Sequence, residues 1–371
     1  MNDELLNKRI LYIVKGDVFG GAEKIIFDLA FHFKNIVGYL AVASLEDKVK
    51  DRFIEKGIPF YSLYFSRLPK IAKVIHFILS VPKYIRANSI NIIQTPHRIY
   101  LPLLNFLQCF LKFRIIYSAV NTFYDYKGFI CRADSYTALS SAVYTNLTSY
   151  YRIAESKVVL IHHGINQTES NSVVSIYKIR NDNSLVIGYA GRFVKEKGIK
   201  YLLEAISRIK NSNIQLIIKG CGPLKVDLEK RIKKYGINEL VIFEKWESDL
   251  SLFWSKIDLL ILPSIKNEGL GLILLEAMQK ERMIIASDLD GIKDRIKNNW
   301  NGFLFEPGSV NDLYEKINFV ISGRYDVEMI HNSKKTMQEF NIIYTFKKFE
   351  QLYFNIGKNV NNINAIQRNN T

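Results

Sequence analysis

The stretch Leu260–Met278, which reads L-I-L-P-S-I-K-N-E-G-L-G-L-I-L-L-E-A-M, constrains the fold of this chain more than any other. Its apolar start, followed at once by a Pro-Ser pair, predicts a buried strand that ends at Leu262. A polar loop containing Gly269 and Gly271 then leads into an apolar helix. Strand, glycine turn and helix form the repeating unit of a parallel α/β sheet.

Two glutamates bracket the predicted start of this helix. Glu268 is expected at the helix N-terminus, and Glu276 about two turns along it. Backbone N–H groups at a helix start are unpaired, and the helix dipole favours negative charge there. This environment suits a nucleotide diphosphate, and a carboxylate beside it suits sugar hydroxyls. The stretch therefore predicts a ligand site.

Length and composition indicate a folded protein of two domains. The chain has 371 residues, of which 48% are hydrophobic and 23% charged; this excludes a disordered chain. The three cysteines (Cys109, Cys131 and Cys221) are too widely spaced for a disulfide framework or a zinc site, so a reducing cytoplasm is expected. The first residues lack the apolar core of a signal peptide, and no apolar stretch reaches the ~18 residues of a membrane span.

The net charge of +15 is unevenly distributed, because no acidic residue occurs between Glu55 and Asp125. This segment contains nine basic residues: Lys56, Arg67, Lys70, Lys73, Lys83, Arg86, Arg98, Lys112 and Arg114. They are either ordinary solvated charges or part of a binding surface. Nucleic-acid binding is disfavoured because no recognition module is present. An anionic membrane surface is favoured, since Arg67–Arg86 interleaves basic residues with Ile, Phe, Leu and Tyr.

The amino half begins with a strand at Arg9–Lys15, a glycine turn at Gly16–Lys24 and a helix from near Ala22. In the turn, Gly20 and Gly21 would let the backbone approach a ligand closely. Further strands are predicted at Gly38–Ala43, Ile58–Leu63, Ile90–Gln94, Arg114–Ser118, Ser135–Leu139 and Val158–Ile161.

A polar segment, Gln167–Asn183, predicts a linker between residues 1–166 and 184–340. The second series of strands is predicted at Leu185–Ala190, Ile214–Ile218, Val241–Phe243, Leu259–Leu262, Met283–Ala286 and Gly302–Phe305. Residues 341–357 are expected to form a last helix, centred on Tyr344–Phe354, and residues 358–371 an Asn-rich disordered tail.

Three turns of the second series carry residues suited to ligand binding, at the edge where an open α/β sheet places its ligands. The pairs on these turns are Arg192 with Lys197, Gly220 with Gly222, and Glu268 with Glu276. Two cations facing one point would neutralise a diphosphate, and arginine can bind it bidentately. They would also stabilise it as a leaving group while negative charge builds on its oxygens.

These motifs resemble the consecutive signatures of the family 4 retaining glycosyltransferases. The matching segments are G-R-F-V-K-E-K-G, K-G-C-G-P, D-L-L-I-L-P-S and E-G-L-G-L-I-L-L-E-A-M, with G-G-A-E-K, Q-T-P-H and H-H-G-I-N in the amino half. The resemblance spans roughly residues 9 to 350. It implies the GT-B fold, in which two Rossmann-like α/β domains face each other across a donor/acceptor cleft and the C-terminal helix crosses back to the N-terminal domain.

The resemblance also implies residue roles at the donor. Arg192 and Lys197 would hold the diphosphate, Glu276 would bind the ribose hydroxyls, and Glu268 would contact the transferred sugar. The donor-binding set implied in addition consists of Gly20, Gly21, Gly220, Gly222, the amides of Gly269, Leu270 and Gly271, and Trp246 near the base pocket. For Trp246, core packing or a surface turn is the favoured interpretation, because most tryptophans are largely buried.

One departure from the family pattern concerns the acceptor side. Family members commonly carry a histidine in a T-x-H segment after the strand that matches Arg114–Ser118, and this chain has Asn121 there. Asparagine exchanges hydrogen bonds but takes no proton at neutral pH. The closest histidine motif is His97, which is either structural or part of the acceptor site. No general base is therefore assigned.

Asp288-Leu289-Asp290 has the form of a D-x-D metal motif. It follows a predicted strand and precedes Gly291, so turn and helix-capping chemistry explains it better. The resemblance implies transfer without a metal or other cofactor.

The expected function is retaining transfer of a hexosyl-type sugar from a nucleotide sugar to a hydroxyl acceptor. A UDP-sugar is favoured over a GDP-sugar as the donor. The acceptor is expected to be a lipid-linked oligosaccharide of bacterial surface polysaccharide (capsule, O-antigen or exopolysaccharide), at the inner face of the cytoplasmic membrane. The alternative is a non-catalytic glycosyltransferase-like subunit, suggested by Asn121. A nicotinamide dehydrogenase is excluded, because no strand runs into G-x-G-x-x-G.

Overall fold

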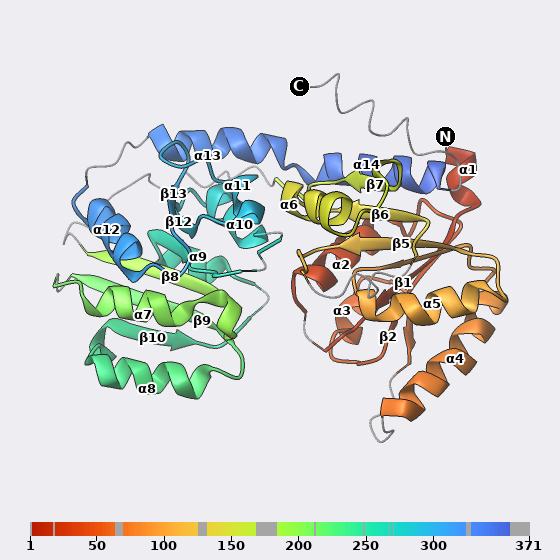
Figure 1. Ribbon diagram of the computed structural model, residues 1–371, viewed down its shortest axis with the longest axis horizontal. Helices are drawn as coiled ribbons and strands as arrows, with labels where there is room; N and C mark the ends of the chain where they lie inside the picture. Colours follow the sequence, from red (N-terminus) through yellow and green to blue (C-terminus); the bar gives the residue numbers. More distant parts are fainter. Residues whose placement is uncertain are drawn as a thin grey trace. The chain divides into compact units, whose positions relative to one another are not determined.

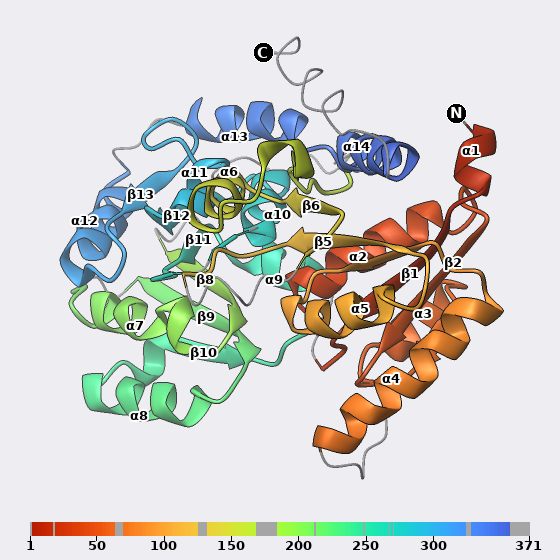
Figure 2. The same ribbon diagram turned by 45° about the vertical axis from the view of Figure 1, so that its right-hand side comes forward.

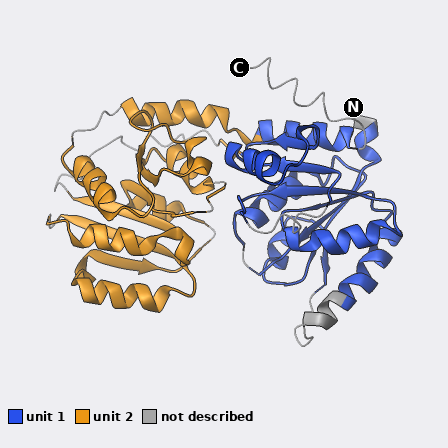
Figure 3. Ribbon diagram, viewed as in Figure 1, with its two compact units in different colours: residues 1–163, 343–371 blue, residues 164–342 orange. Residues whose placement is uncertain are grey.

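The computed structural model describes residues 2–17, 19–63, 70–124, 132–167, 184–210, 213–247, 249–266, 268–269, 271–323 and 328–356. The chain divides into two compact units, residues 1–163 with 343–371 and residues 164–342 (Figure 3). Each unit is built around one parallel β-sheet with helices on its faces (Figures 1 and 2). Most of the predicted linker and all of the predicted tail lie outside the described residues.

The sheet of the first unit has seven strands in the order β3-β2-β1-β4-β5-β6-β7, and all of its pairs are parallel. The strands are β1 (Arg9–Val14), β2 (Tyr39–Ser44), β3 (Phe60–Ser62), β4 (Ile92–Thr95), β5 (Arg114–Ala119), β6 (Ser135–Ala138) and β7 (Val158–Leu160). Four of the six residues of β1 are aliphatic, and five are fully buried. A strand buried on both faces reads as such a continuous apolar run.

Parallel neighbouring strands need crossover connections, and helices of the first unit between successive strands supply them. The helices are α1 (Asn2–Leu6), α2 (Gly21–Phe33), α3 (Lys50–Glu55), α4 (Lys70–Ala87), α5 (Leu101–Gln108), α6 (Ser141–Thr145) and α14 (Ile342–Asn355). Short turns are the 3-10 helices η1 (Arg98–Tyr100) and η4 (Glu155–Lys157) and the π-helix η3 (Asn146–Tyr150).

The last helix, α14, belongs to the first unit although it follows the whole second unit in sequence (Figure 3). Its Phe349, Leu352 and Tyr353 are fully buried. The Tyr12 hydroxyl in β1 lies 2.9 Å from the Tyr353 hydroxyl, which donates to Gln94 Oε1 at 2.6 Å. Gln94 in turn donates to Ser118 at 2.8 Å. A buried hydrogen-bond chain therefore ties α14 to three central strands.

The sheet of the second unit has six strands in the order β10-β9-β8-β11-β12-β13, again with all pairs parallel. The strands are β8 (Leu185–Arg192), β9 (Ile214–Cys221), β10 (Val241–Glu244), β11 (Leu259–Leu262), β12 (Met283–Ser287) and β13 (Phe303–Phe305). The helices are η5 (Lys195–Lys197), α7 (Ile199–Ser207), α8 (Lys225–Tyr235), η6 (Asn238–Leu240), α9 (Ser251–Lys256), α10 (Leu272–Gln279), α11 (Asp290–Lys293), α12 (Val310–Ile321) and α13 (Glu328–Glu339).

One face of this sheet packs on α7, α8 and α12 through a continuous aliphatic core. Leu202 and Leu203 of α7 and Leu313 of α12 are fully buried in it. Buried residues recur at helical spacing, so each helix turns one apolar stripe to the sheet: Ile199, Leu202, Leu203 and Ile206 on α7, and Leu313, Ile317 and Val320 on α12.

Each of the thirteen predicted strands overlaps an observed strand. At the carboxyl edge, the predicted ends of β8 and β9 are wrong, because these strands run to Arg192 and Cys221 and not to Ala190 and Ile218. The reason is that Gly191 pairs with Gly220 and keeps the two backbones in register past the end of the apolar runs. The segment between Phe305 and the last helix, where no element is predicted, forms α12 and α13.

Candidate functional site

The predicted donor residues of the second unit lie at the carboxyl edge of its sheet. Arg192 ends β8 and is exposed, and Lys197 follows on the short helix η5. The register of the sheet places Arg192 opposite Cys221, between Gly220 and Gly222. Parallel pairing therefore brings the first two predicted turns side by side.

Glycine permits the close contact between these two turns. A Cβ on Gly220 would lie 2.0 Å from the carbonyl oxygen of Gly191, and a Cβ on Gly222 would lie 2.6 Å from that of Phe193. Real Cβ atoms do not approach so closely, so only glycine fits. The backbone N–H of Phe193 donates to the carbonyl of Cys221 at 2.8 Å and joins the turns directly.

A second close contact joins η5 to the loop after β11. Gly198 has a left-handed φ of 62°, and a Cβ there would lie 1.9 Å from the carbonyl oxygen of Pro263. The N–H of Ile265 donates to the carbonyl of Glu196 at 2.8 Å. Backbone thus packs on backbone, which fixes Lys197 relative to the loop that carries Glu268.

A third contact supports the Glu268 loop from the other side. A Cβ on Gly291, in α11, would lie 1.7 Å from the carbonyl oxygen of Glu268 and 3.2 Å from the Cα of Gly269. The loop therefore lies directly on the first turn of α11, where a larger residue would displace it.

These contacts place Lys197 and Glu268 in a buried ion pair. Lys197 Nζ lies 2.6 Å from Glu268 Oε2, and the Ser264 hydroxyl donates to the same oxygen at 2.5 Å. The side chains of Lys197 and Glu268 are only 19% and 9% exposed. A charge-assisted pair of this kind has a fixed geometry, because both partners are held by packing as well as by charge.

The environment keeps Glu268 ionised despite its burial. Burial acts to raise the pKa of Glu268, but Lys197, Ser264 and Arg192 outweigh it and hold the pKa below its ordinary value. The neighbouring Tyr189 responds in the opposite sense, since burial and the charge of Glu268 raise the pKa of its hydroxyl well above the ordinary value. The Tyr189 hydroxyl donates to the carbonyl of Arg192 at 3.0 Å.

A further cation, Arg295, lies buried behind the same loop. Its Nη1 donates to the carbonyl of Gly291 at 3.4 Å, and its guanidinium lies over the Phe340 ring at 4.9 Å. Among the described residues, Nε and Nη2 have no hydrogen-bond partner. Burial lowers the pKa of Arg295 from 12.5 to about 10, and Asp294 and Glu268 act to raise it. Arg295 stays charged at neutral pH and adds positive potential behind Glu268.

The predicted position of Glu268 at a helix N-terminus is wrong. Helix α10 begins at Leu272, four residues later, after Gly271 with a left-handed φ of 50°. Glu276 accordingly lies just over one turn into α10. The departure arises because the contact with α11 holds Glu268 in the preceding loop. Gly269 is buried, and Leu270 lies outside the described residues.

Trp246 follows β10 and is 38% exposed, so the core-packing interpretation is wrong for it. The adjacent charged cluster is centred on Lys219 at the end of β9. Lys219 is buried, and its Nζ lies 2.7 Å from Glu247 and 3.3 Å from Glu244. This cluster fixes the turn on which Trp246 stands, while a base pocket there stays a prediction.

In the first unit, Gly20, Gly21 and His97 gather around Glu23, a residue to which the sequence motifs assign no role. Gly20 precedes α2 and its N–H donates to Glu23 Oε2 at 3.3 Å, while Gly21 begins the helix. His97 Nε2 lies 3.1 Å from Glu23 Oε1, and Glu23 is only 5% exposed. The glycine turn after β1 and the histidine after β4 thus share one carboxylate.

Asn121 follows β5 at the same edge of the first sheet. Two residues on, Phe123 donates its N–H to Asn146 Oδ1 at 3.1 Å and accepts from Asn146 Nδ2 at 2.7 Å. The guanidinium of Arg98 lies over the Phe123 ring at 3.9 Å. The segment with Asn121 is therefore anchored, and the roles of Asn121, His97, Gly20 and Gly21 toward a ligand stay predictions.

Asp288 and Asp290 both pair with Lys293, at 3.0 and 3.6 Å. Asp290 is the first residue of α11, in agreement with a helix-start role. Within the described parts of the chain, no three His, Cys, Asp or Glu side chains gather closely enough to hold a metal ion.

The sequence signals for the remaining residues of the site are of unequal strength. Glu23 stands three residues after Gly20, the spacing of a helix-capping carboxylate, and this signal is readable. Ser264 directly follows Pro263, and Arg295 lies in an otherwise polar segment. Nothing local distinguishes Arg295, because Phe340 is 45 residues away in the chain. Ser264 stands only four residues before its partner Glu268, so this contact lies within reach of the local sequence.

Comparisons with known proteins bear on the family and the fold of this chain. Residues 177–337 match the family model described as "Glycosyl transferases group 1". The capsular polysaccharide biosynthesis glycosyltransferase CapM of Staphylococcus aureus is 30% identical over 193 residues, which are 50% of each chain. The UDP-Gal:alpha-D-GlcNAc-diphosphoundecaprenol alpha-1,3-galactosyltransferase of Escherichia coli is 28% identical over 186 residues, 48% of this chain and 47% of that protein. This chain thus spans about half the length of each of these relatives.

Among solved structures, Anabaena Alr3699/HepE in complex with UDP and glucose superposes with a TM-score of 0.80 at 18% identity, covering 93% of this chain and 98% of that chain. At this identity the similarity establishes the fold. Together with the two parallel sheets, it confirms the predicted two-domain, Rossmann-like GT-B architecture.

A pair of glycine variants tests whether the backbone contact at Gly198 holds the site together. Gly198 and Gly236 both have left-handed φ values, 62° and 68°, but a Cβ on Gly236 would have no other atom within 4 Å. Gly236→Ala should cost about 1–2 kcal/mol of unfolding free energy from backbone conformation alone. Gly198→Ala should cost about 1–3 kcal/mol more, because Pro263 must move. Equal costs in urea unfolding would contradict the packing argument.

The Lys197→Met variant tests the ion pair through its pH dependence. A carboxyl whose pKa is depressed stabilises the folded state at neutral pH, and this stabilisation is lost as the pH falls from 4.5 through the folded pKa. Without Lys197 the pKa of Glu268 should rise, so the variant should lose less stability than the wild type on acidification below pH 4.5. Urea unfolding at neutral and acidic pH measures the difference. The exposed-site variant Lys230→Met should keep the wild-type profile, and an unchanged profile in Lys197→Met would refute the assignment.

Proposed function

We propose that this chain, whose residues 177–337 match the family model of the glycosyl transferases group 1, moves a hexosyl-type sugar from a nucleotide-diphosphate sugar to a hydroxyl acceptor. The observation that carries the proposal is the buried pair of Lys197 and Glu268, with the exposed Arg192 charge beside it on adjacent strand ends. The resemblance to family 4 supports a retaining outcome, which stays part of the proposal.

The cations provide the site for the donor diphosphate. Arg192 is exposed at the end of β8, where its guanidinium can bind two phosphate oxygens. Lys197 is held in place by Glu268, so little side-chain entropy is lost when it meets the phosphate. A diphosphate next to an ionised carboxylate is repelled, so the charge of Glu268 must face the sugar and not the phosphates.

The hydrogen bonds of Glu268 identify the atom that would meet the sugar. Both Lys197 and Ser264 use Oε2. Oε1 is then the oxygen placed to accept from a sugar hydroxyl. Glu276, on α10, would accept from the ribose hydroxyls, as the family resemblance implies.

In the proposed reaction, the bond between the anomeric carbon and the diphosphate oxygen breaks as the acceptor oxygen approaches from the same face. Arg192 and Lys197 stabilise the charge that builds on the departing diphosphate. A phosphate oxygen takes the proton of the acceptor hydroxyl, and the new glycosidic bond keeps the anomeric configuration. No protein base is needed, which is compatible with Asn121 where relatives carry histidine. Glycosidases that retain configuration work differently, through two closely placed carboxylates.

A UDP-sugar is the favoured donor, and transfer is proposed to need no metal. The name of the E. coli relative specifies UDP-Gal, and the Anabaena structure contains UDP and glucose. The names of the two relatives also specify capsular polysaccharide and a diphosphoundecaprenol acceptor. They support a lipid-linked glycan as the acceptor of this chain.

The surface of the first unit supports an acceptor presented at an anionic membrane. On α4, Ile75 and Leu79 are 52% and 60% exposed, and Lys83 and Arg86 continue the same stripe toward the helix end. Helix α5 lies next to α4 (Figures 1 and 2), and Phe110 just beyond it is 68% exposed. Apolar side chains flanked by cations favour binding to anionic lipid. In the part of the chain that the structure describes, no helix is long and apolar enough to cross a membrane.

A non-catalytic subunit is the second candidate, and Asn121 is the observation that favours it. Donor hydrolysis or sugar transfer by the purified protein would exclude this candidate. Binding of nucleotide without any turnover would support it.

We expect UDP-sugars to raise the melting temperature more than GDP- or ADP-sugars, since a ligand at 100 times its Kd adds about 2.7 kcal/mol of stability. Lys197→Ala and Glu276→Ala should each lose most of this shift and of the turnover. Glu229→Ala, which removes an exposed carboxylate on α8, is the matched control and should behave as wild type.

The anomeric configuration of the product, read by NMR, tests retention. Unchanged binding in both site variants would refute the site.

Flotation with anionic liposomes tests the membrane surface. The wild type should float at low salt and less at high salt, because screening weakens the attraction of the cations to the lipid. Leu79→Glu should reduce flotation, since it places a negative charge in the exposed apolar stripe. Ile54→Glu, at a site on α3 that is 50% exposed, is the control. Absence of salt-sensitive flotation would remove the membrane argument.

A further inference from the structure

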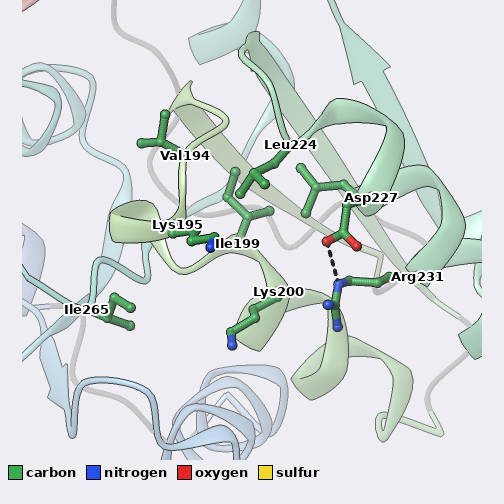
Figure 4. Close-up of a pocket in the computed structure, with 9 residues that line it drawn as sticks. Val194, Lys195, Ile199, Lys200, Leu224, Asp227, Arg231 and Ile265 are labelled. Carbon is green, nitrogen blue, oxygen red and sulfur yellow. Dashed lines mark hydrogen bonds and ion pairs between the residues drawn. The ribbon is translucent and has the colours of Figure 1, made fainter.

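A pocket of about 280 Å³ is lined by residues of the loops after β8 and β11 and of the helices α7 and α8 (Figure 4). Its lining includes Lys195 and Lys200 and the apolar side chains of Leu224, Leu228 and Ile265. None of the residues assigned to the donor is among them. Its volume is close to the lower end of the range for small-molecule sites, about 300 Å³.

The lining of this pocket combines an apolar floor with a cationic rim. Five of its nine residues are aliphatic, and three carry positive charge. Asp227 accepts from Arg231 Nε at 2.8 Å and so compensates only that cation (Figure 4). Lys195 and Lys200 are exposed, and among the described residues neither ammonium has an ion-pair partner; Lys200 lies over the Tyr201 ring at 4.6 Å.

Two residues that line the pocket are close in sequence to residues of the candidate donor site. Lys195 is in η5, two residues before Lys197, and Ile265 directly follows Ser264. The backbone bond from Ile265 to Glu196, at 2.8 Å, connects these walls. A molecule in the pocket would therefore contact the segments on either side of the Lys197–Glu268 pair.

We propose that this pocket is a second ligand site, which takes a small anion with an apolar group, such as an aryl or alkyl phosphate or sulfonate. The anionic group lies between Lys195 and Lys200, and the apolar part rests on Leu224, Leu228 and Ile265. A ligand bound in the pocket restrains residues 194–198, which include Lys197. That this restraint alters donor binding rests on the function proposed above.

The fluorescent probe 1-anilinonaphthalene-8-sulfonate has both chemical features and tests the site directly. We expect saturable binding to the full chain, not displaced by UDP, and slower amide hydrogen exchange in residues 194–200 and 224–231. The double variant Lys195→Glu/Lys200→Glu should bind about tenfold more weakly. The control Lys230→Glu/Lys234→Glu makes the same charge change at exposed positions of α8 outside the pocket and should bind as wild type.

Three outcomes would overturn the proposal: no saturable binding, equal weakening in both double variants, or protection from exchange elsewhere in the chain. Displacement of the probe by UDP would also overturn it, because the probe would then occupy the donor site. The Val194→Phe variant, which fills the pocket without a charge change, should bind the probe more weakly while its melting curve shows that it is folded. Failure of the chain to bind any nucleotide sugar would refute the proposed function and leave these results unaffected.

Discussion

The candidate site depends on direct contact between backbones at the carboxyl edge of the second sheet. Gly220, Gly198 and Gly291 each allow one loop to lie against another at a distance that any side chain would prevent. The two charges of the Lys197–Glu268 pair stand on loops fixed in this way, so their separation is set before any ligand arrives. Preorganised charge of this kind stabilises a developing negative charge without further reorganisation.

Most of the fold could be predicted because each strand of a parallel sheet is buried on both faces and reads as one apolar run. The exact ends of strands and starts of helices were predicted less well. The extension of β8 to Arg192 depends on pairing with β9 and has no local signal. The loop position of Glu268 depends on Gly291, 23 residues further along the chain. Local patterns report what a residue prefers, and such tertiary contacts decide otherwise.

The residues of the candidate site could be predicted from the sequence, but the ion pair between Lys197 and Glu268 could not. Charged residues that follow neighbouring strands meet at one edge, which placed Arg192, Lys197 and Glu268 together. Their pairing was not readable, because Lys197 and Glu268 are 71 residues apart and the predicted roles assign them to different parts of the donor. The burial of Arg295 was equally hidden, since it depends on Phe340 from the segment after α13.

The hydrogen-bond chain from Tyr12 through Tyr353 to Gln94 has a consequence for the order of synthesis. Domains generally fold as units, the amino-terminal one first, while the chain leaves the ribosome. Here the first unit lacks Tyr353, Phe349 and Leu352 until the whole second unit has been made. The nascent first sheet therefore has α2 but not α14 on this face until then, whereas the second unit, residues 164–342, is one continuous segment.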